Sequence, residues 1–268
     1  MENKTERFYL IDNLRGIMIL GVVLFHFFFD LYFVGLPIGE KIITSDWFNI
    51  IAVTGRTLFV FIAGICSRLS HNNLKRALIV IGGAAFIQLV TFLIDIVMFD
   101  DVGVLYIYFG ILHLLGTCML IYGLFEKLFN KIKINSTKNH MPSVIIAVLL
   151  FTLFVGAFNF ENNTLFGIHI NTYENGLYGT YIGSILGFSG YELHSADYFP
   201  IIPWAFAFFS GAFIGVFFKE DRVPAVFHKN FCPLLSVIGS KTLYIYILHQ
   251  PLVYGIAILI NHIAVTAL

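Results

Sequence analysis

The strongest constraint in this sequence is a succession of apolar stretches that are each about as long as a bilayer is thick. A hydrocarbon core of about 30 Å is crossed by roughly 20 apolar residues in a helix. We expect seven spans, at 13–36, 47–66, 76–98, 104–125, 143–160, 198–218 and 236–264. The expected fold class is therefore all-α, a polytopic transmembrane helical bundle of seven to eight spans that forms a single integral-membrane domain over residues 1–268.

The composition agrees with a membrane protein and excludes several other classes. Hydrophobic residues make up 58% of the chain and charged residues 12%, whereas soluble domains carry about 25% charged residues. Lys plus Arg and Asp plus Glu number 16 each. The chain therefore lacks the excess of basic residues that would indicate a nucleic-acid partner. The three cysteines show no metal-ligand spacing, and we expect them to pack and no metal to bind.

The segment 161–197 separates the fifth and sixth spans and is rich in Asn, Gly and Tyr. We expect it to be extracytoplasmic. Its piece at 179–189 is short and glycine-rich, which favours an interfacial or re-entrant helix. The alternative is an eighth span, which would return the C-terminus to the side of the N-terminus.

The distribution of basic residues predicts the orientation. One set of loops holds twelve Lys and Arg residues, and the other set holds Lys41 alone. Cytoplasmic loops are the ones enriched in Lys and Arg. The N-terminus is therefore predicted to be cytoplasmic, and seven spans place the C-terminus outside.

Polar residues inside the spans each need a reason, because ionisable groups at membrane depth cost about 2.5–3.5 kcal/mol on insertion scales. They are Arg15, His26 and Asp30 on the first span, Arg56 on the second, Asp95 on the third, His113 on the fourth, and Lys241, His249 and Gln250 on the seventh. Asp95 and His113 are isolated on apolar helices, and we expect structural roles for both.

His26 and Asp30 are four residues apart and share a helix face. A carboxylate at that spacing can hold the imidazole in one tautomer; the alternative is a polar pair that only packs against another helix. At about 1.5 Å per residue, Arg56 and His249 reach depths that overlap that of His26. A single polar centre shared by the first, second and seventh spans is therefore predicted, unless Arg56 pairs structurally with an aspartate and His249 only forms an interhelical hydrogen bond.

Arg15 and Lys241 both lie near the cytoplasmic ends of their spans. Each either extends to lipid headgroups or binds a phosphate-bearing ligand that enters from the cytoplasm. We assign them, together with Gln250, to a cofactor-binding group.

Four stretches resemble one family of membrane enzymes. They are DNLRGIMILGVVLFHFFFD (12–30), GRTLFVFIAGICSRLS (55–70), DYFPIIPWAFAFFSGAFIG (197–215) and IGSKTLYIYILHQPLV (238–253). They are similar to the heparan-α-glucosaminide N-acetyltransferase catalytic-domain family, in particular its bacterial branch. More distantly they resemble the membrane acyltransferase-three family, whose first helix carries an arginine and a histidine separated by ten residues, as Arg15 and His26 are.

The resemblance implies a multi-pass acyltransferase of the cell membrane, the plasma membrane of a bacterium. Such an enzyme transfers an acyl group, here acetyl, from cytoplasmic acyl-CoA to a glycan or amino-sugar acceptor on the far side. By motif, His26 is the catalytic residue, Arg15 contacts the CoA phosphates and the helix around His249 lines the tunnel. The lysosomal heparan enzymes instead carry asparagine at the position of His26 and their catalytic histidine in the following loop. Residues 37–46 hold no histidine, so the acyltransferase-three arrangement is favoured.

Two chemical routes remain open for such a site. His26 acts as a general base oriented by Asp30, or it becomes acyl-histidine itself; Arg56 or His249 then stabilises the oxyanion. We assign Tyr181, Asp197 and Trp204 to acceptor binding at the outer face. The partners expected are membrane lipid, acyl-CoA and the acceptor, and a homodimer is compatible with the sequence. A proton-coupled solute transporter that uses the same His/Asp/Arg cluster is the alternative function, and a non-enzymatic scaffold is the third.

Overall fold

A computed structural model describes residues 7–99, 104–132, 140–170, 176–188 and 197–266. Within these residues the chain is almost entirely helical, and its one sheet is a two-residue hairpin of β1 (Thr164–Leu165) and β2 (Ile168–His169). The chain divides into two compact units. We call residues 1–59 with 223–268 the terminal unit, and residues 60–222 the middle unit.

Six of the described helices are long and apolar enough to cross a membrane. They are α1 (Tyr9–Phe33), α3 (Asp46–Leu69), α4 (Asn73–Phe99), α5 (Ile111–Ile132), α8 (Ile201–Lys219) and α10 (Thr242–Thr266). The prediction of an all-α polytopic bundle is confirmed, and the chain is a multi-pass membrane protein.

The ends of all seven predicted spans differ from the helices by a few residues, and three spans also differ in length, start or continuity. The predicted span 143–160 forms α6 (Met141–Gly156), whose 16 residues extend over about 24 Å. The predicted span 104–125 begins as a helix only at Ile111. The predicted span 236–264 is divided at Lys241 into α9 (Pro233–Ser240) and α10.

Local contacts explain two of these differences. Before α5, the backbone amides of Leu105 and Tyr106 donate to the carboxylate of Asp95, so this segment is held to α4 instead of continuing the helix. At the other break, α9 lies against the start of α1, and a Cβ on Gly239 would overlap the backbone of Asp12. This close contact keeps α9 beside α1, and α10 starts anew after it.

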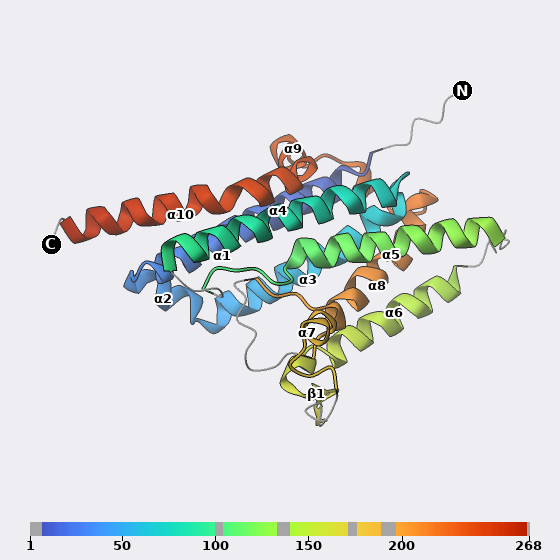
Figure 1. Cartoon of the computed structure of the whole chain (residues 1–268). Helices are drawn as coiled ribbons and strands as arrows, with labels where there is room; N and C mark the ends of the chain where they lie inside the picture. Colours follow the sequence, from blue (N-terminus) through green and yellow to red (C-terminus); the bar gives the residue numbers. More distant parts are fainter. Residues whose placement is uncertain (1–6, 100–103, 133–139, 171–175, 189–196, 267–268) are drawn as a thin grey trace. The chain divides into compact units, whose positions relative to one another are not determined.

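In the terminal unit, α1 is the central helix. It packs against α2 (Pro37–Ile43), α9 and α10, and against the short helix η2 (Ala225–His228). The helices α1 and α10 lie side by side (Figure 1). Arg15 contacts Thr242 and His26 contacts His249 further along both helices, so the two helices run in the same direction.

In the middle unit, α4 packs against α5, and α6 packs against α8. The C-terminal part of α3 also contacts α8, because Cβ atoms on Gly64 and Gly211 would overlap the opposite backbones. The predicted extracytoplasmic segment 161–197 contains η1 (Phe160–Asn162) at its start, the hairpin, and α7 (Tyr181–Leu186); its residues 171–175 and 189–196 lie outside the described part. A six-residue α7 is far shorter than the roughly 20 residues that cross a bilayer.

Candidate functional site

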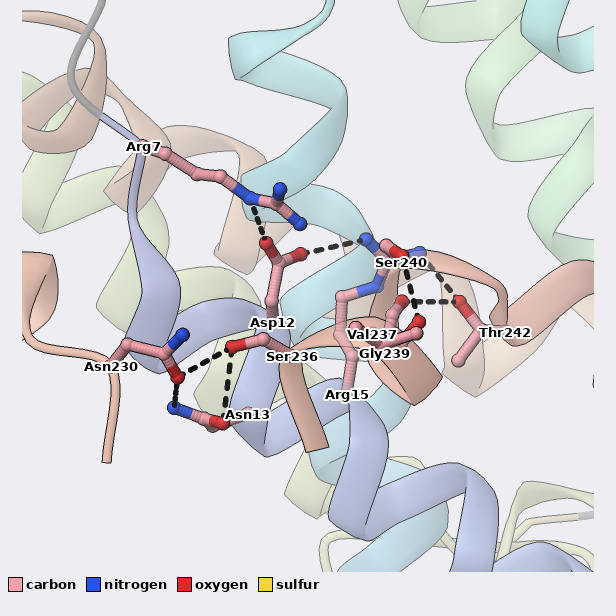
Figure 2. A network of polar contacts seen from close by, with 10 residues as sticks. All are labelled: Arg7, Asp12, Asn13, Arg15, Asn230, Ser236, Val237, Gly239, Ser240 and Thr242. Atoms are coloured by element: carbon pink, nitrogen blue, oxygen red, sulfur yellow. Dashed lines mark hydrogen bonds and ion pairs between the residues drawn. The ribbon is translucent and has the colours of Figure 1, made fainter. Parts of the chain in front are cut away.

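Polar contacts at the start of α1 join this helix to the start of α10 (Figure 2). The carboxylate of Asp12 lies between two arginines, with Oδ2 at 2.7 Å from Arg7 Nε and Oδ1 at 3.5 Å from Arg15 Nη1. Arg15 also donates from Nη2 to the hydroxyl of Thr242 at 2.5 Å. Its side chain remains 25% exposed, so a positive charge of fixed position is available at this end of the unit.

A second set of contacts fixes α9 against α1. Ser236 Oγ donates to Asn230 Oδ1 at 2.9 Å, and Asn13 Nδ2 donates to the same oxygen at 3.3 Å (Figure 2). Asn13 and Ser236 are both buried. Gly16 adds to this packing, because a Cβ there would overlap the backbone of Leu235. The position of Arg15 is therefore determined by two helices packed at backbone contact.

Further along the same two helices, the rings of His26 and His249 face one another. Their centroids are 4.9 Å apart and their planes are inclined by 57°. His249 is 6% exposed, and its Nδ1 lies 2.7 Å from the backbone oxygen of Tyr246. His26 is partly buried and its ring contacts Phe25 edge-on. The structure thus brings together the two histidines for which the sequence predicts a shared depth.

One turn further along α1, the buried Asp30 pairs with the half-buried Gln250. Gln250 Nε2 donates to both carboxylate oxygens of Asp30, at 3.0 Å and 3.3 Å, and Asp30 is 3% exposed. The predicted role of Asp30 in holding His26 differs from this arrangement, because the carboxylate is bound by the amide of Gln250. Gln250, assigned from sequence to the cofactor group, instead lies in the polar centre.

Arg56 reaches the same part of the terminal unit from α3. Its guanidinium carbon lies 5.9 Å from the centroid of the Phe25 ring, and its Nε donates to the backbone oxygen of Ala52 at 3.3 Å. A cation over an aromatic face at this distance is stabilised by the ring quadrupole. Arg56 therefore lies beside the residue that precedes His26, with its charge next to an aromatic ring.

The remaining predicted site residues lie apart from these contacts or in the other unit. Lys241 is exposed at the junction of α9 and α10, with Nζ 5.8 Å from the centroid of the Tyr244 ring. Asp197 accepts a hydrogen bond from the first backbone amide of α5 at 3.1 Å, as a helix cap does. Tyr181 is 52% exposed at the start of α7.

Trp204 is the predicted acceptor-binding residue whose surroundings differ most from the expectation. It is 7% exposed, and its ring contacts those of Phe154, Phe158 and Phe199 at centroid distances of 5.4, 5.9 and 4.8 Å. An indole enclosed by three phenyl rings contributes to the core of the middle unit.

The sequence interpretation missed three residues of the site. Asp12 is three residues before Arg15, a spacing that signals an ion pair on a helix. Thr242 and Tyr246 precede His249 by seven and three residues on α10, but the hydroxyl and the backbone oxygen that they contribute carry no sequence signal. In the described part of the chain, no three His, Cys, Asp or Glu side chains are grouped as metal ligands would be.

Two places in the terminal unit offer polar atoms to a ligand. Arg15 presents a fixed, partly exposed guanidinium, the group that binds phosphate most directionally. Deeper in the unit, His249 Nε2 and Gln250 Oε1 are buried and have no hydrogen-bond partner among the described residues. A buried acceptor that receives no hydrogen bond costs free energy. Hydrogen-bond donors of a bound ligand would remove this cost.

Comparison with known proteins gives one match. The family model described as "Heparan-alpha-glucosaminide N-acetyltransferase, catalytic" matches residues 7–251. No curated protein and no solved structure matches the chain. The matched range includes two polar layers of the terminal unit. One layer is formed by Arg7, Asp12, Arg15 and Thr242, and the other is formed by His26, Asp30, His249 and Gln250.

Proposed function

Because the chain belongs to the family of heparan-α-glucosaminide N-acetyltransferase catalytic domains, we propose that it transfers acetyl groups from cytoplasmic acetyl-CoA to an extracytoplasmic acceptor. Membership makes the protein a membrane acetyltransferase that acts on carbohydrate. The acceptor group proposed is an amine or a hydroxyl of a sugar. Acetyl-CoA is the proposed donor, and the transfer occurs within the membrane-spanning part of the terminal unit.

The observation that carries the proposal is the polar centre between α1 and α10. His26, Asp30, His249 and Gln250 contact one another in two pairs in the central parts of two mostly apolar helices. Ionisable groups at membrane depth are costly and mark functional sites by default. A thioester and a sugar that approach from opposite faces need polar groups at such a depth.

The distance between Arg15 and His26 also supports the proposal. It lies eleven residues before His26 on the same helix, a separation of about 16 Å. A ligand that binds Arg15 through phosphate and presents its acyl group to His26 must therefore be elongated. CoA has this form, because a flexible arm separates its phosphates from its thioester.

The test is thiol release from acetyl-CoA by the purified protein in detergent, with glucosamine or total cell-envelope glycans as acceptor. Wild type is expected to release CoA thiol faster when acceptor is present. His26→Ala should lower the rate by about 10²-fold, the scale of losing one positioning group. His262→Ala is the matched control, because His262 is an exposed histidine near the far end of α10.

A binding measurement tests the donor site separately. Arg15→Ala should raise the Kd for acetyl-CoA about 10-fold or more, because hydrogen bonds to charged groups contribute about 1.5–3 kcal/mol. Lys41→Ala removes an exposed cation that is predicted to lie on the other side of the membrane, and it should leave the Kd unchanged. Absence of thiol release with every short-chain acyl-CoA would overturn the proposal.

A further inference from the structure

The hydrogen bond of His249 fixes the protonation of its ring. Nδ1 lies 2.7 Å from the backbone oxygen of Tyr246. A carbonyl oxygen only accepts hydrogen bonds, so Nδ1 carries the proton. In the neutral ring, Nε2 then holds a lone pair and is the basic nitrogen.

This basic nitrogen is buried and free. Nε2 of His249 has no hydrogen-bond partner among the described residues, and the ring that faces it is that of His26, at a centroid distance of 4.9 Å. A backbone carbonyl on one imidazole nitrogen and an unpaired second nitrogen is the arrangement that orients a histidine for proton transfer or ligand binding. Among the described residues, Nε2 thus has no proton donor, and it is the ring nitrogen that can take a proton from a ligand.

His26 lacks such an orienting contact. Asp30, the carboxylate on its own helix face, accepts both of its described hydrogen bonds from Gln250. No hydrogen bond to the His26 ring is found in the part of the chain that the structure describes. Of the two histidines, only His249 has a ring fixed in one tautomer.

We propose that His249, and not His26, is the general base that takes the proton from the acceptor nucleophile, an inference that rests on the proposed function. The acceptor nitrogen or oxygen attacks the thioester carbonyl carbon and forms the new C–N or C–O bond while its proton passes to His249 Nε2. Collapse of the tetrahedral adduct breaks the C–S bond, and the electron pair leaves on sulfur. The proton on Nε2 passes to that thiolate, which yields CoA thiol and the acetylated acceptor.

Two acceptors that differ in their need for a base test this assignment. The amine of glucosamine has to lose a proton as it attacks and needs a proton acceptor for this, whereas hydroxylamine is a strong nucleophile that attacks thioesters without one. His249→Asn keeps an amide N–H near the position of Nδ1 and removes the basic nitrogen. Rates are measured with both acceptors for wild type, His249→Asn and His26→Asn, after subtraction of the uncatalysed reaction.

The expected result is selective loss in one variant. In His249→Asn, transfer to glucosamine should fall about 10²–10⁴-fold, the contribution of general base catalysis, and transfer to hydroxylamine should fall far less. In His26→Asn, both rates should fall by the same factor. Equal losses in His249→Asn, or the selective loss in His26→Asn instead, would overturn the assignment. A wild-type protein that acetylates neither acceptor would overturn the proposed function itself.

A spectroscopic measurement tests the tautomer without any assay of activity. In protein labelled with ¹⁵N-histidine, the His249 signals are those that disappear in His249→Gln or His249→Asn. Nδ1 should show a directly bonded proton, and Nε2 should have the downfield shift of an unprotonated nitrogen. The reverse pattern would overturn the proposal, whatever the variants do to the rate.

Discussion

The Asp30–Gln250 pair predicts that two substitutions together are less damaging than one of them alone. Asp30 is 3% exposed and its described hydrogen bonds both come from Gln250 Nε2. Gln250→Leu therefore leaves a buried carboxylate without a donor. Loss of a hydrogen bond to a charged group costs about 1.5–3 kcal/mol, and stranding a buried charge costs about 3–5 kcal/mol. We expect Gln250→Leu to lower the free energy of unfolding by about 2–4 kcal/mol.

The double variant Asp30→Leu/Gln250→Leu removes the stranded charge together with its partner. Replacing both members of a buried polar pair by apolar groups is often close to neutral. The double variant should therefore recover at least about 1–2 kcal/mol relative to Gln250→Leu, the lower part of the cost of one unsatisfied buried group.

The assay is reversible unfolding in mixed detergent micelles, followed by tryptophan fluorescence and helical circular dichroism. Gln88→Leu is the matched control, because Gln88 Nε2 donates only to neutral acceptors among the described residues, the hydroxyl of Tyr106 at 2.9 Å and the backbone oxygen of Tyr108 at 3.3 Å. It should cost about 0.5–1.5 kcal/mol. A double variant whose loss equals or exceeds that of Gln250→Leu alone would refute the reasoning, since removal of the carboxylate would then not relieve the loss of its partner.

Three further predictions concern packing, capping and the donor. Gly16→Ala should lower stability by about 1–3 kcal/mol through overpacking, because the new Cβ would overlap backbone atoms of Leu235. Gly21→Ala on the same helix is the control: its Cβ would meet nothing within 4 Å, and it should be neutral or stabilising in a thermal melt. Asp95→Asn should cost about 1–3 kcal/mol in the same melt, because an amide offers one acceptor oxygen to the two backbone amides that the carboxylate binds at 2.8 and 3.0 Å; its Kd for acetyl-CoA should not change. Acetyl phosphate should not replace acetyl-CoA as donor when the acetylated acceptor itself is measured, because its phosphate and acetyl group are directly joined and cannot reach both polar layers.

The features that the sequence predicted well depend on the length of the apolar stretches and on the regular geometry of the helix. Apolar length identified the six long helices, and the rise per residue placed His26 and His249 at one depth, where the structure brings their rings together. An isolated acid on an apolar helix was expected to be structural, and Asp95 indeed binds two backbone amides. Each of these inferences uses information within one segment.

The features that were wrong or missed depend on which segments meet. The spacing of His26 and Asp30 shows that they share a face, but the partner of Asp30 is decided by how α10 is rotated against α1, and that rotation presents Gln250. The break at Lys241 follows from the contact of α9 with the start of α1, more than 200 residues away in sequence. Helix ends and hydrogen-bond partners set by such distant contacts leave no local pattern to detect.

The two polar layers of the terminal unit constrain one another through the helices that carry them. Arg15 and His26 are on α1, Thr242 and His249 are on α10, and the two helices run parallel with contacts at both layers. The separation is about 16 Å along α1 but about 10 Å along α10, and the length of the Arg15 side chain accounts for much of the difference. A change in the packing of α9 would therefore shift Arg15 and Thr242 relative to the histidines. Under the proposed function, it would also alter the distance that bound acetyl-CoA has to span. The glycines that bring α9 into backbone contact with α1 would then influence the fit of the donor as well as the stability of the fold.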